Sequence, residues 1–262
     1  SVETIFPNGK AIQGATSHHL GQHFSKAFGI SFVGKDEKKH HVWQNSWGLS
    51  TRSLGIMFAV HGDDRGLVLP PRIAEDQVVI VPITFAKDPK GAQDILKKAK
   101  SLQESLQKAG VRAFVDARDD QSPGWKFHEW ELKGIPIRME LGPKDLGAKK
   151  VMMVTRDDGK KNSVSFSSLA KTVSKELESM QSRMFEKASA FLDAHTTPVQ
   201  SLNDLKRVVK TGIALAPWCG EQEETIKDQT GAKSLNIPLA QPDVSNMKCV
   251  VLIPDGNIAL GK

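Results

Sequence analysis

Residues 77–141 alternate between short apolar runs and an amphipathic pattern, and this alternation limits the possible folds more than any other feature. The run QVVIVPI at residues 77–83 is β-branched and apolar, which is typical of a buried strand. Residues 92–109 place apolar side chains three and four positions apart and end before Gly110, which predicts a helix with a glycine C-cap. A strand, a short helix and a third strand are then predicted over residues 111–117, 125–133 and 135–141. This order predicts an α/β fold with a mostly parallel sheet covered by helices.

The segments that follow continue with clear patterns. Residues 151–155 and 164–166 predict a hairpin around Asp158-Gly159. An apolar stripe predicts one long helix over residues 169–194, and a shorter helix is expected over residues 202–210.

The segment before residue 77 is less decisive. Its apolar run at residues 54–60 fits a buried strand or a helix, because periodicity does not separate the two in so short a run. Residues 31–41 (SFVGKDEKKHH) are expected to form a charged turn.

Composition sets wide bounds on function. The 262 residues include 36 Lys and Arg against 30 Asp and Glu, a formal net charge of +6, which fits an RNA partner, although a solvated surface gives the same value. Hydrophobic residues make up 39% of the chain and charged residues 25%, as in ordinary soluble globular proteins. Two cysteines, Cys219 and Cys249, are too few for a disulfide scaffold or an all-cysteine zinc site. No apolar stretch reaches the length of a membrane helix, and the first ten residues lack a secretory core.

Three clusters combine residue types that suit ligand binding. Residues 13–22 (QGATSHHLGQ) set hydroxyls and imidazoles between glycines, where backbone can approach a ligand closely, but a polar turn with a hydrogen-bonded histidine is the alternative. Residues 47–52 (WGLSTR) place one arginine beside two hydroxyls, which suits a phosphate, and a surface salt bridge is the alternative. Residues 116–138 interleave aromatic and cationic side chains, as surfaces for unpaired RNA bases do, and a helix with its tryptophans in the core is the alternative.

Histidine-bound metal is not predicted. His19 and His23 are four positions apart, but no Glu follows His19 and no third ligand can be placed. The sequence also lacks the Walker A loop, the GxGxxG fingerprint and the GxSxG nucleophile elbow.

Four blocks of sequence, in one order, resemble a known family. They are GATSHHLGQHFSKAFGI from Gly14, WQNSWGLSTRSLGIMFAVHGDDRGLVLPPRIA from Trp43, QVVIVPI from Gln77 and SPGWKFHEWELKGIPIRMELGPKD from Ser122. Together they resemble the C-terminal half of class II prolyl-tRNA synthetases of the archaeal and eukaryotic type. The resemblance implies the end of an antiparallel-sheet catalytic domain (residues 1–74), an α/β anticodon-binding domain with a mostly parallel sheet (residues 75–166) and a small α+β C-terminal domain (residues 167–262).

The same resemblance implies an activity and the residues that serve it. The family activates proline with ATP and Mg and transfers it to tRNA(Pro). The residues that match ATP-binding positions are Gln13, Thr16, Ser50, Thr51 and Arg52. Arg52 is also the expected catalytic residue, because a fixed positive charge stabilises the charge that develops on the reacting phosphate. His18 and Gly48 match the proline pocket.

The resemblance also suggests four residues for anticodon contact: Arg118, Lys126, Glu131 and Arg138. Lys126 and Arg138 are the stronger candidates, because phosphates and base edges both favour cations. The expected partners are tRNA(Pro) and proline, with no membrane.

Two departures from the family shape the remaining expectations. Relatives hold zinc through four cysteines, whereas here Cys219 and Cys249 are joined only by Glu224 and Asn236 near the other two positions, so we expect no metal. The first two class II motifs do not occur in these residues, so we expect them on a separate chain or a further segment, with the complete enzyme a homodimer and this chain alone inactive. The alternative is a non-catalytic tRNA- or protein-binding module derived from the synthetase. The expected location is the cytoplasm or an organelle.

Overall fold

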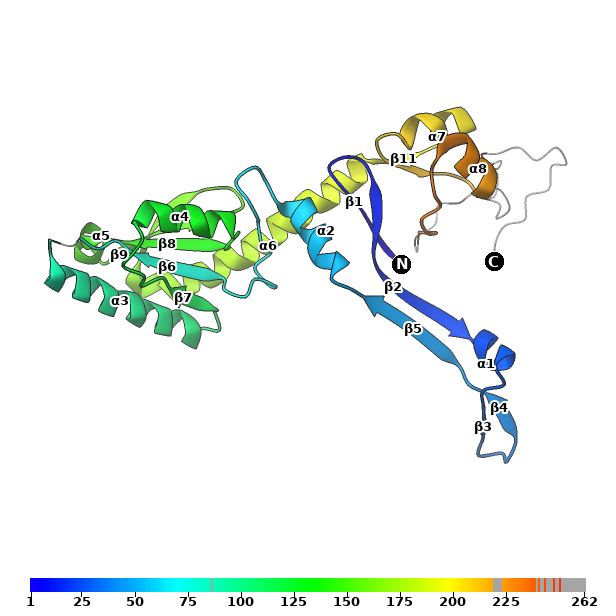
Figure 1. The fold of residues 1–262 in the computed structure, drawn as a ribbon, viewed down its shortest axis with the longest axis horizontal. Coiled ribbons are helices and arrows are strands. Elements are labelled where there is room, and N and C mark those ends of the chain that lie inside the picture. The colour runs from blue at the N-terminus through cyan, green and yellow to red at the C-terminus, as the bar shows by residue number, and fades with distance from the viewer. Residues whose placement is uncertain are drawn as a thin grey trace. The chain divides into compact units, whose positions relative to one another are not determined.

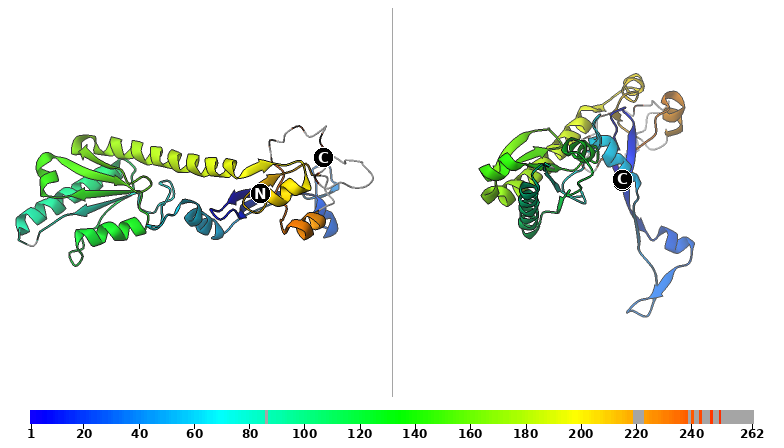
Figure 2. Two further views of the ribbon diagram at one scale, coloured as in Figure 1. Left: turned by 90° about the horizontal axis from the view of Figure 1, so that it is seen from above. Right: turned by 60° about the vertical axis from the view of Figure 1, so that its left-hand side comes forward.

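The computed structural model describes residues 1–85, 87–218 and 223–238, together with residues 240, 243, 247 and 250. It divides into two compact units, Met57–Ser189 on the one hand and Ser1–Ile56 with Ala190–Lys262 on the other. Figures 1 and 2 show the elements of each unit, which are described separately below. Among the described residues, no helix has both the length and the apolar character needed to cross a bilayer. The domain boundaries at residues 74 and 166 stay a prediction.

The unit Met57–Ser189 is built on a five-stranded sheet in the order β10-β9-β8-β6-β7 (Figure 1). Its strands are β6 (Val78–Pro82), β7 (Ala113–Val115), β8 (Ile137–Leu141), β9 (Lys150–Thr155) and β10 (Lys161–Ser165). β6 runs parallel to β7 and β8, whereas β9 runs antiparallel to β8 and to β10. The sheet is therefore mixed, and the parallel arrangement is limited to three strands. The connection from β8 to β9 holds only the six-residue helix α5 (Pro143–Ala148), whereas a parallel crossover needs roughly a dozen residues.

Two helices of this unit begin at side-chain caps, α3 three residues and α4 two residues before the predicted starts. Asp88 Oδ1 accepts a hydrogen bond from Gly91 N at 2.9 Å at the start of α3 (Pro89–Lys108). Ser122 Oγ accepts one from Trp125 N at 3.3 Å at the start of α4 (Pro123–Leu132). The long helix α6 (Leu169–Ala194), preceded by the 3₁₀ turn η1 (Phe166–Ser168), has the predicted bounds.

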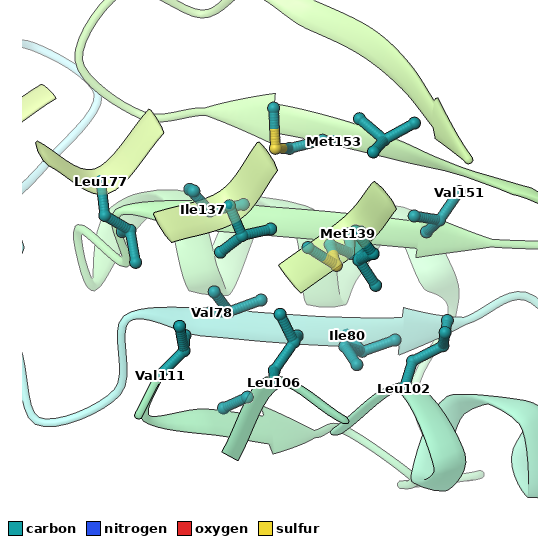
Figure 3. Packing of buried hydrophobic residues seen from close by; sticks show 14 of the residues in the cluster. Val78, Ile80, Leu102, Leu106, Val111, Ile137, Met139, Val151, Met153 and Leu177 are labelled. Atoms are coloured by element: carbon teal, nitrogen blue, oxygen red, sulfur yellow. The ribbon is translucent and has the colours of Figure 1, made fainter. Parts of the chain in front are cut away.

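The main core lies on one face of this sheet, between the strands and the helices α3 and α6 (Figure 3). The strands contribute Val78, Ile80, Ile137, Met139, Val151 and Met153. The opposite face carries Val79 and Val81 of β6, which pack with Ile135 against Phe127 and Trp130 of α4. On that second face, α4 therefore packs on β6 and leaves room for a pocket beside β8.

The other unit contains an antiparallel sheet in the order β1-β2-β5. Its strands are β1 (Val2–Ile5), β2 (Ala11–Gly21) and β5 (Gln44–Leu49), with α1 (His23–Ala27) after β2. β2 and β5 run side by side as a long ribbon (Figure 2). The predicted charged turn at residues 31–41 is instead a hairpin of β3 (Ser31–Val33) and β4 (Lys39–His41), because only the charged residues 35–38 lie in the loop between these two short paired strands. The undecided run at residues 54–60 lies in the helix α2 (Arg52–His61), whose last residues belong to the first unit.

The C-terminal part of this unit is small. β11 (Thr196–Pro198) and β12 (Ile213–Leu215) pair in parallel, and α7 (Leu202–Val208) lies between them in sequence. Helix α8 (Glu223–Thr230) contributes Ile226 to a core with Val199, Leu205 and Val250.

Candidate functional site

A β-bulge in β2 sets the direction of the predicted ligand residues. Val2 pairs with Ala15 and Glu3 pairs with Gln13, so β2 holds one extra residue, Gly14, opposite β1. Paired residues share a face, and neighbouring residues of β1 alternate between faces. Gln13 and Ala15 therefore lie on opposite faces, although they are two positions apart.

This bulge brings the candidate ligands together on one face. Thr16 and His18 also lie on the face opposite to Ala15, because β2 alternates normally after the bulge. Gly48 of β5 pairs with Thr16, and a Cβ placed on Gly48 would have, among the described residues, Thr16 Oγ1 at 3.8 Å as its one neighbour within 4 Å. A side chain at Gly48 would thus meet little on the face that carries Gln13, Thr16 and His18.

The turn between β5 and α2 ends beside the bulge. Ser53 Oγ donates a hydrogen bond to Gly14 O at 3.2 Å, which fixes the first turn of α2 against β2. Arg52 N donates to Ser50 Oγ at 3.3 Å. The guanidinium of Arg52 is exposed and makes no hydrogen bond or ion pair with any described residue. Ser50, Thr51 and Arg52 therefore stand beside the end of the strand that carries Gln13, with one cation free to meet an anion.

The neighbouring imidazoles His18 and His19 face opposite ways. His19 lies on the other face of β2, where its Nδ1 is 2.9 Å from Asn45 Oδ1 and its ring stacks on Trp43 at 5.5 Å. Among the described residues, no group of three His, Cys, Asp or Glu side chains could hold a metal ion. Cys219 and Cys249 lie outside the described residues, whereas Glu224 is exposed on α8 and Asn236 Nδ2 donates to Ser1 O at 3.0 Å.

In the other unit, the fully buried Asp116 organises the aromatic and cationic cluster. Its carboxylate accepts hydrogen bonds from Arg118 Nε at 2.9 Å, Arg118 Nη2 at 2.6 Å and Trp130 Nε1 at 2.8 Å. Burial acts to raise the pKa of Asp116, but the hydrogen bonds from Arg118 and Trp130 outweigh it and lower the pKa to about 2. Asp116 therefore stays ionised inside the unit and fixes the position of Arg118.

Lys126 is part of the same network. Its side chain is only 4% exposed, and Nζ donates to Asp116 O at 3.2 Å and to Arg118 O, with Asp116 Oδ1 at 3.8 Å. An ammonium in this position is turned inward, towards backbone carbonyls. The geometry favours a structural role for Lys126 over the RNA contact that the sequence suggested.

We expect Lys126→Ala to lower the free energy of unfolding by about 3 kcal/mol, because Asp116 loses a buried cation and two carbonyls lose a donor. Lys133→Ala is the matched control, since that lysine is 55% exposed and bonded only to the surface of α4. Urea denaturation of both variants measures the difference. A Lys126→Ala variant of normal stability that binds tRNA weakly would restore Lys126 as an RNA contact.

Arg118 keeps part of its side chain in solvent. Its Nη2 also lies 2.5 Å from Glu129 Oε2, and its guanidinium stands 5.3 Å from the ring of Trp125, which is 46% exposed. The side chains of Asp116 and Glu129 raise the pKa of Arg118, so it is permanently charged. Arg118 and Trp125 together form an exposed cation–aromatic surface at the start of α4.

Glu131 and Arg138 meet in a separate pocket of about 240 Å³ on the face of the sheet that α4 only partly covers. Arg138 donates to Glu140 Oε1 at 3.0 Å and to Phe127 O at 3.1 Å, and lies over the Phe127 ring at 4.6 Å. Arg138 also shares a cross-strand row with Lys161, because both pair with Val154 of β9. The residues that line the pocket are Arg65, Glu131, Ile135, Arg138, Val154, Thr155, Arg156, Gly159 and Lys161.

The structure thus divides the four predicted anticodon residues between two places. Arg118 and Lys126 belong to the Asp116 network, whereas Glu131 and Arg138 line the pocket. The sequence analysis missed Arg65 and Lys161, which also line it. The strand register predicts Lys161 once the hairpin is placed, but no local pattern marks Arg65.

Two family profiles match the chain. The profile described as "Anticodon binding domain" matches residues 77–176, and the one described as "Prolyl-tRNA synthetase, C-terminal" matches residues 202–252. The first match contains the Asp116 network and all but one of the residues that line the pocket.

Curated relatives match most of the chain. A proline–tRNA ligase of Cenarchaeum symbiosum is 44% identical over 241 residues, which cover 91% of this chain and 50% of that protein. The cytoplasmic proline–tRNA ligase of Arabidopsis thaliana is 43% identical, over 93% of this chain and 47% of that protein. A putative proline–tRNA ligase of Saccharomyces cerevisiae is 44% identical, over 92% of this chain and 39% of that protein. The chain thus spans about half the length, or less, of these relatives. Over more than nine-tenths of its length the chain is similar to proline–tRNA ligases, and residues 202–252 match the C-terminal domain of prolyl-tRNA synthetases.

Proposed function

We propose that this chain is the part of a proline–tRNA ligase that supplies one side of the ATP and proline site and the anticodon-binding surface. The observation that carries the proposal is the shared face of Gln13, Thr16 and His18, which the bulge at Gly14 creates beside Arg52. A module that only bound RNA would have no use for an exposed face with, at its end, an arginine that has no partner among the described residues.

The proposed chemistry has two steps. A carboxylate oxygen of proline attacks the α-phosphorus of ATP, and pyrophosphate leaves to give prolyl-adenylate. A ribose hydroxyl at the 3′ end of tRNA(Pro) then attacks the carbonyl carbon, and AMP leaves. Arg52 would neutralise the charge that builds up on the phosphates in the first step, because a guanidinium is permanently charged and can donate two hydrogen bonds to one phosphate.

We propose that Mg²⁺ binds together with ATP. Gln13 and Thr16 offer an amide oxygen and a hydroxyl on their shared face, and Mg²⁺ in such sites is bound largely through substrate phosphates. We therefore assign ATP and Mg as one substrate, with Gln13, Thr16, Ser50 and Thr51 as its polar contacts. Proline would lie above Gly48, where His18 shares the face.

The pocket beside Arg138 is our proposed site for an anticodon base. Glu131 can accept hydrogen bonds from ring N–H groups of a base. Arg138 and Lys161 can donate hydrogen bonds to carbonyl oxygens of the base and to phosphate oxygens of the RNA backbone. Arg118 and Trp125 offer a second surface for stacking. Cytoplasmic location and a homodimeric complete enzyme belong to the same proposal.

Proline-dependent exchange of pyrophosphate into ATP tests the function. We expect no exchange from this chain alone and clear exchange when a segment or partner chain with the first two class II motifs is added. Absence of exchange in both cases, with tRNA(Pro) still bound, would favour the non-catalytic binding module.

Arg138→Gln is expected to weaken tRNA(Pro) binding about tenfold, because the variant loses a charged donor in the pocket. Pyrophosphate exchange by the assembled enzyme should be unchanged, since Arg138 and Arg52 lie in different units. Lys97→Gln, on an exposed position of α3, is the control. Equal affinities of Arg138→Gln and the wild type would remove the pocket from the RNA-binding surface.

A further inference from the structure

The pocket beside Arg138 takes one wall from outside the segment that matches anticodon-binding domains. That match spans residues 77–176, and eight of the nine lining residues lie within it. The ninth is Arg65, which follows the end of α2 at His61. The pocket is therefore completed by a cation that the segment before the domain supplies.

Arg65 sits on a turn that is fixed to the pocket wall. Asp63 N and Gly66 O, and Gly66 N and Asp63 O, form two hydrogen bonds of 3.0 Å across the turn. The carboxylate of Asp63 receives Arg156 Nη1 at 2.8 Å and Nη2 at 2.6 Å, and this pairing holds the pKa of Asp63 well below its usual range. Arg156 is buried and also donates to Glu131 O at 2.9 Å, so the turn is attached directly to the end of α4.

Backbone contacts strengthen this attachment. Leu67 N donates to Leu132 O at 3.0 Å. Gly66 has a φ of 127° and approaches so closely that a Cβ would lie 2.6 Å from Leu132 O. Only glycine fits both conditions, so Arg65 extends from a rigid base.

The guanidinium of Arg65 lies between two other parts of the pocket lining. Arg65 Nη1 is 3.0 Å from Glu131 Oε1. A Cβ on Gly159, in the turn between β9 and β10, would lie 3.8 Å from Arg65 Nη1. The side chain is 53% exposed, so the guanidinium keeps solvent on one side. Glu131 therefore orients the guanidinium between α4 and the turn at Gly159.

We propose that Arg65 is a further RNA-contacting residue, whose guanidinium stacks on the base that enters the pocket while Glu131 holds its plane. The inference rests on the proposed anticodon function and adds a residue that the anticodon-domain match does not include. An arginine plane is a known stacking partner for unpaired bases, and its charge attracts the neighbouring phosphate. A lysine would supply the charge without the plane.

The test is the affinity of the full chain for tRNA(Pro) transcripts, measured for the wild type, Arg65→Ala and Arg65→Lys. We expect Arg65→Ala to bind about tenfold more weakly, and Arg65→Lys to recover little of that loss. Arg72→Ala is the matched control, because Arg72 also precedes the anticodon-binding match and is 69% exposed in an ion pair with Glu178. On transcripts with an abasic residue at each anticodon position in turn, the wild type and Arg65→Ala should become equal at one position only.

Each outcome has a distinct meaning. Wild-type affinity of Arg65→Ala, with Arg138→Gln still weakened, would overturn the inference and leave the anticodon proposal in place. Wild-type affinity of both variants would count against the anticodon proposal itself. Full recovery by Arg65→Lys, or a loss that persists on every abasic transcript, would show a purely electrostatic contact and overturn the stacking role.

Discussion

Arg52→Ala is expected to slow proline-dependent pyrophosphate exchange about a thousandfold in the assembled ligase. The exposed guanidinium has no partner among the described residues and stands at the end of the face that carries Gln13 and Thr16. Removal of a preorganised cation from the reacting phosphates therefore affects the transition state more than the fold. Because no described contact is lost, the melting temperature should not change.

Two further variants sharpen this test. Arg52→Lys keeps the charge but loses the bidentate fork, so we expect an intermediate rate. Arg72→Ala removes another exposed arginine, which belongs to the other unit, and should leave the exchange rate unchanged. A normal exchange rate for Arg52→Ala would show that another residue meets the phosphates.

Asp116→Asn is expected to lower the free energy of unfolding by about 3 kcal/mol at neutral pH. The neutral amide cannot balance Arg118 and the buried Lys126, although it preserves the shape of the side chain. Urea denaturation measures the change, and Asp94→Asn, on an exposed position of α3, is the control.

The same variant predicts a pH dependence with a definite sign. The pKa of Asp116 is lowered from 3.8 to about 2 in the folded protein, so the ionised carboxylate stabilises the fold above pH 3.8. That contribution is lost as the pH falls from 3.8 towards 2. The difference in stability between the wild type and Asp116→Asn should therefore shrink over this interval, and a constant difference would contradict the assignment.

The predictable part of the fold is the part with strong hydrophobic periodicity. The helix over residues 169–194 and the buried strand β6 follow from their apolar patterns, because the helix has one apolar stripe in a core and the strand is buried on both faces. The strands β2 and β5 were not predicted as strands. Trp47 and Leu49 on one face of β5 are 79% and 75% exposed, so the alternation that identifies a half-buried strand is missing.

The candidate sites were predictable only as residue types. The resemblance named Lys126 and Arg138 together, but their surroundings differ. Lys126 is turned inward because Asp116 and two carbonyls, eight to ten positions earlier, surround its ammonium. Arg65 was missed because its place in the pocket depends on pairing between Asp63 and Arg156, which are 93 positions apart.

The bulge at Gly14 has a consequence for anyone who alters or transplants this strand. A deletion of that single glycine would restore strict pleating with Gln13, Thr16 and His18 still on one face, whereas a regular strand that kept Gly14 would turn Gln13 to the reverse side. A regular strand that carried the same linear sequence would therefore contain every residue of the motif but would not place Gln13 on the face of Thr16 and His18. The transferable unit is the strand together with β1, whose pairing with β2 accommodates the extra residue.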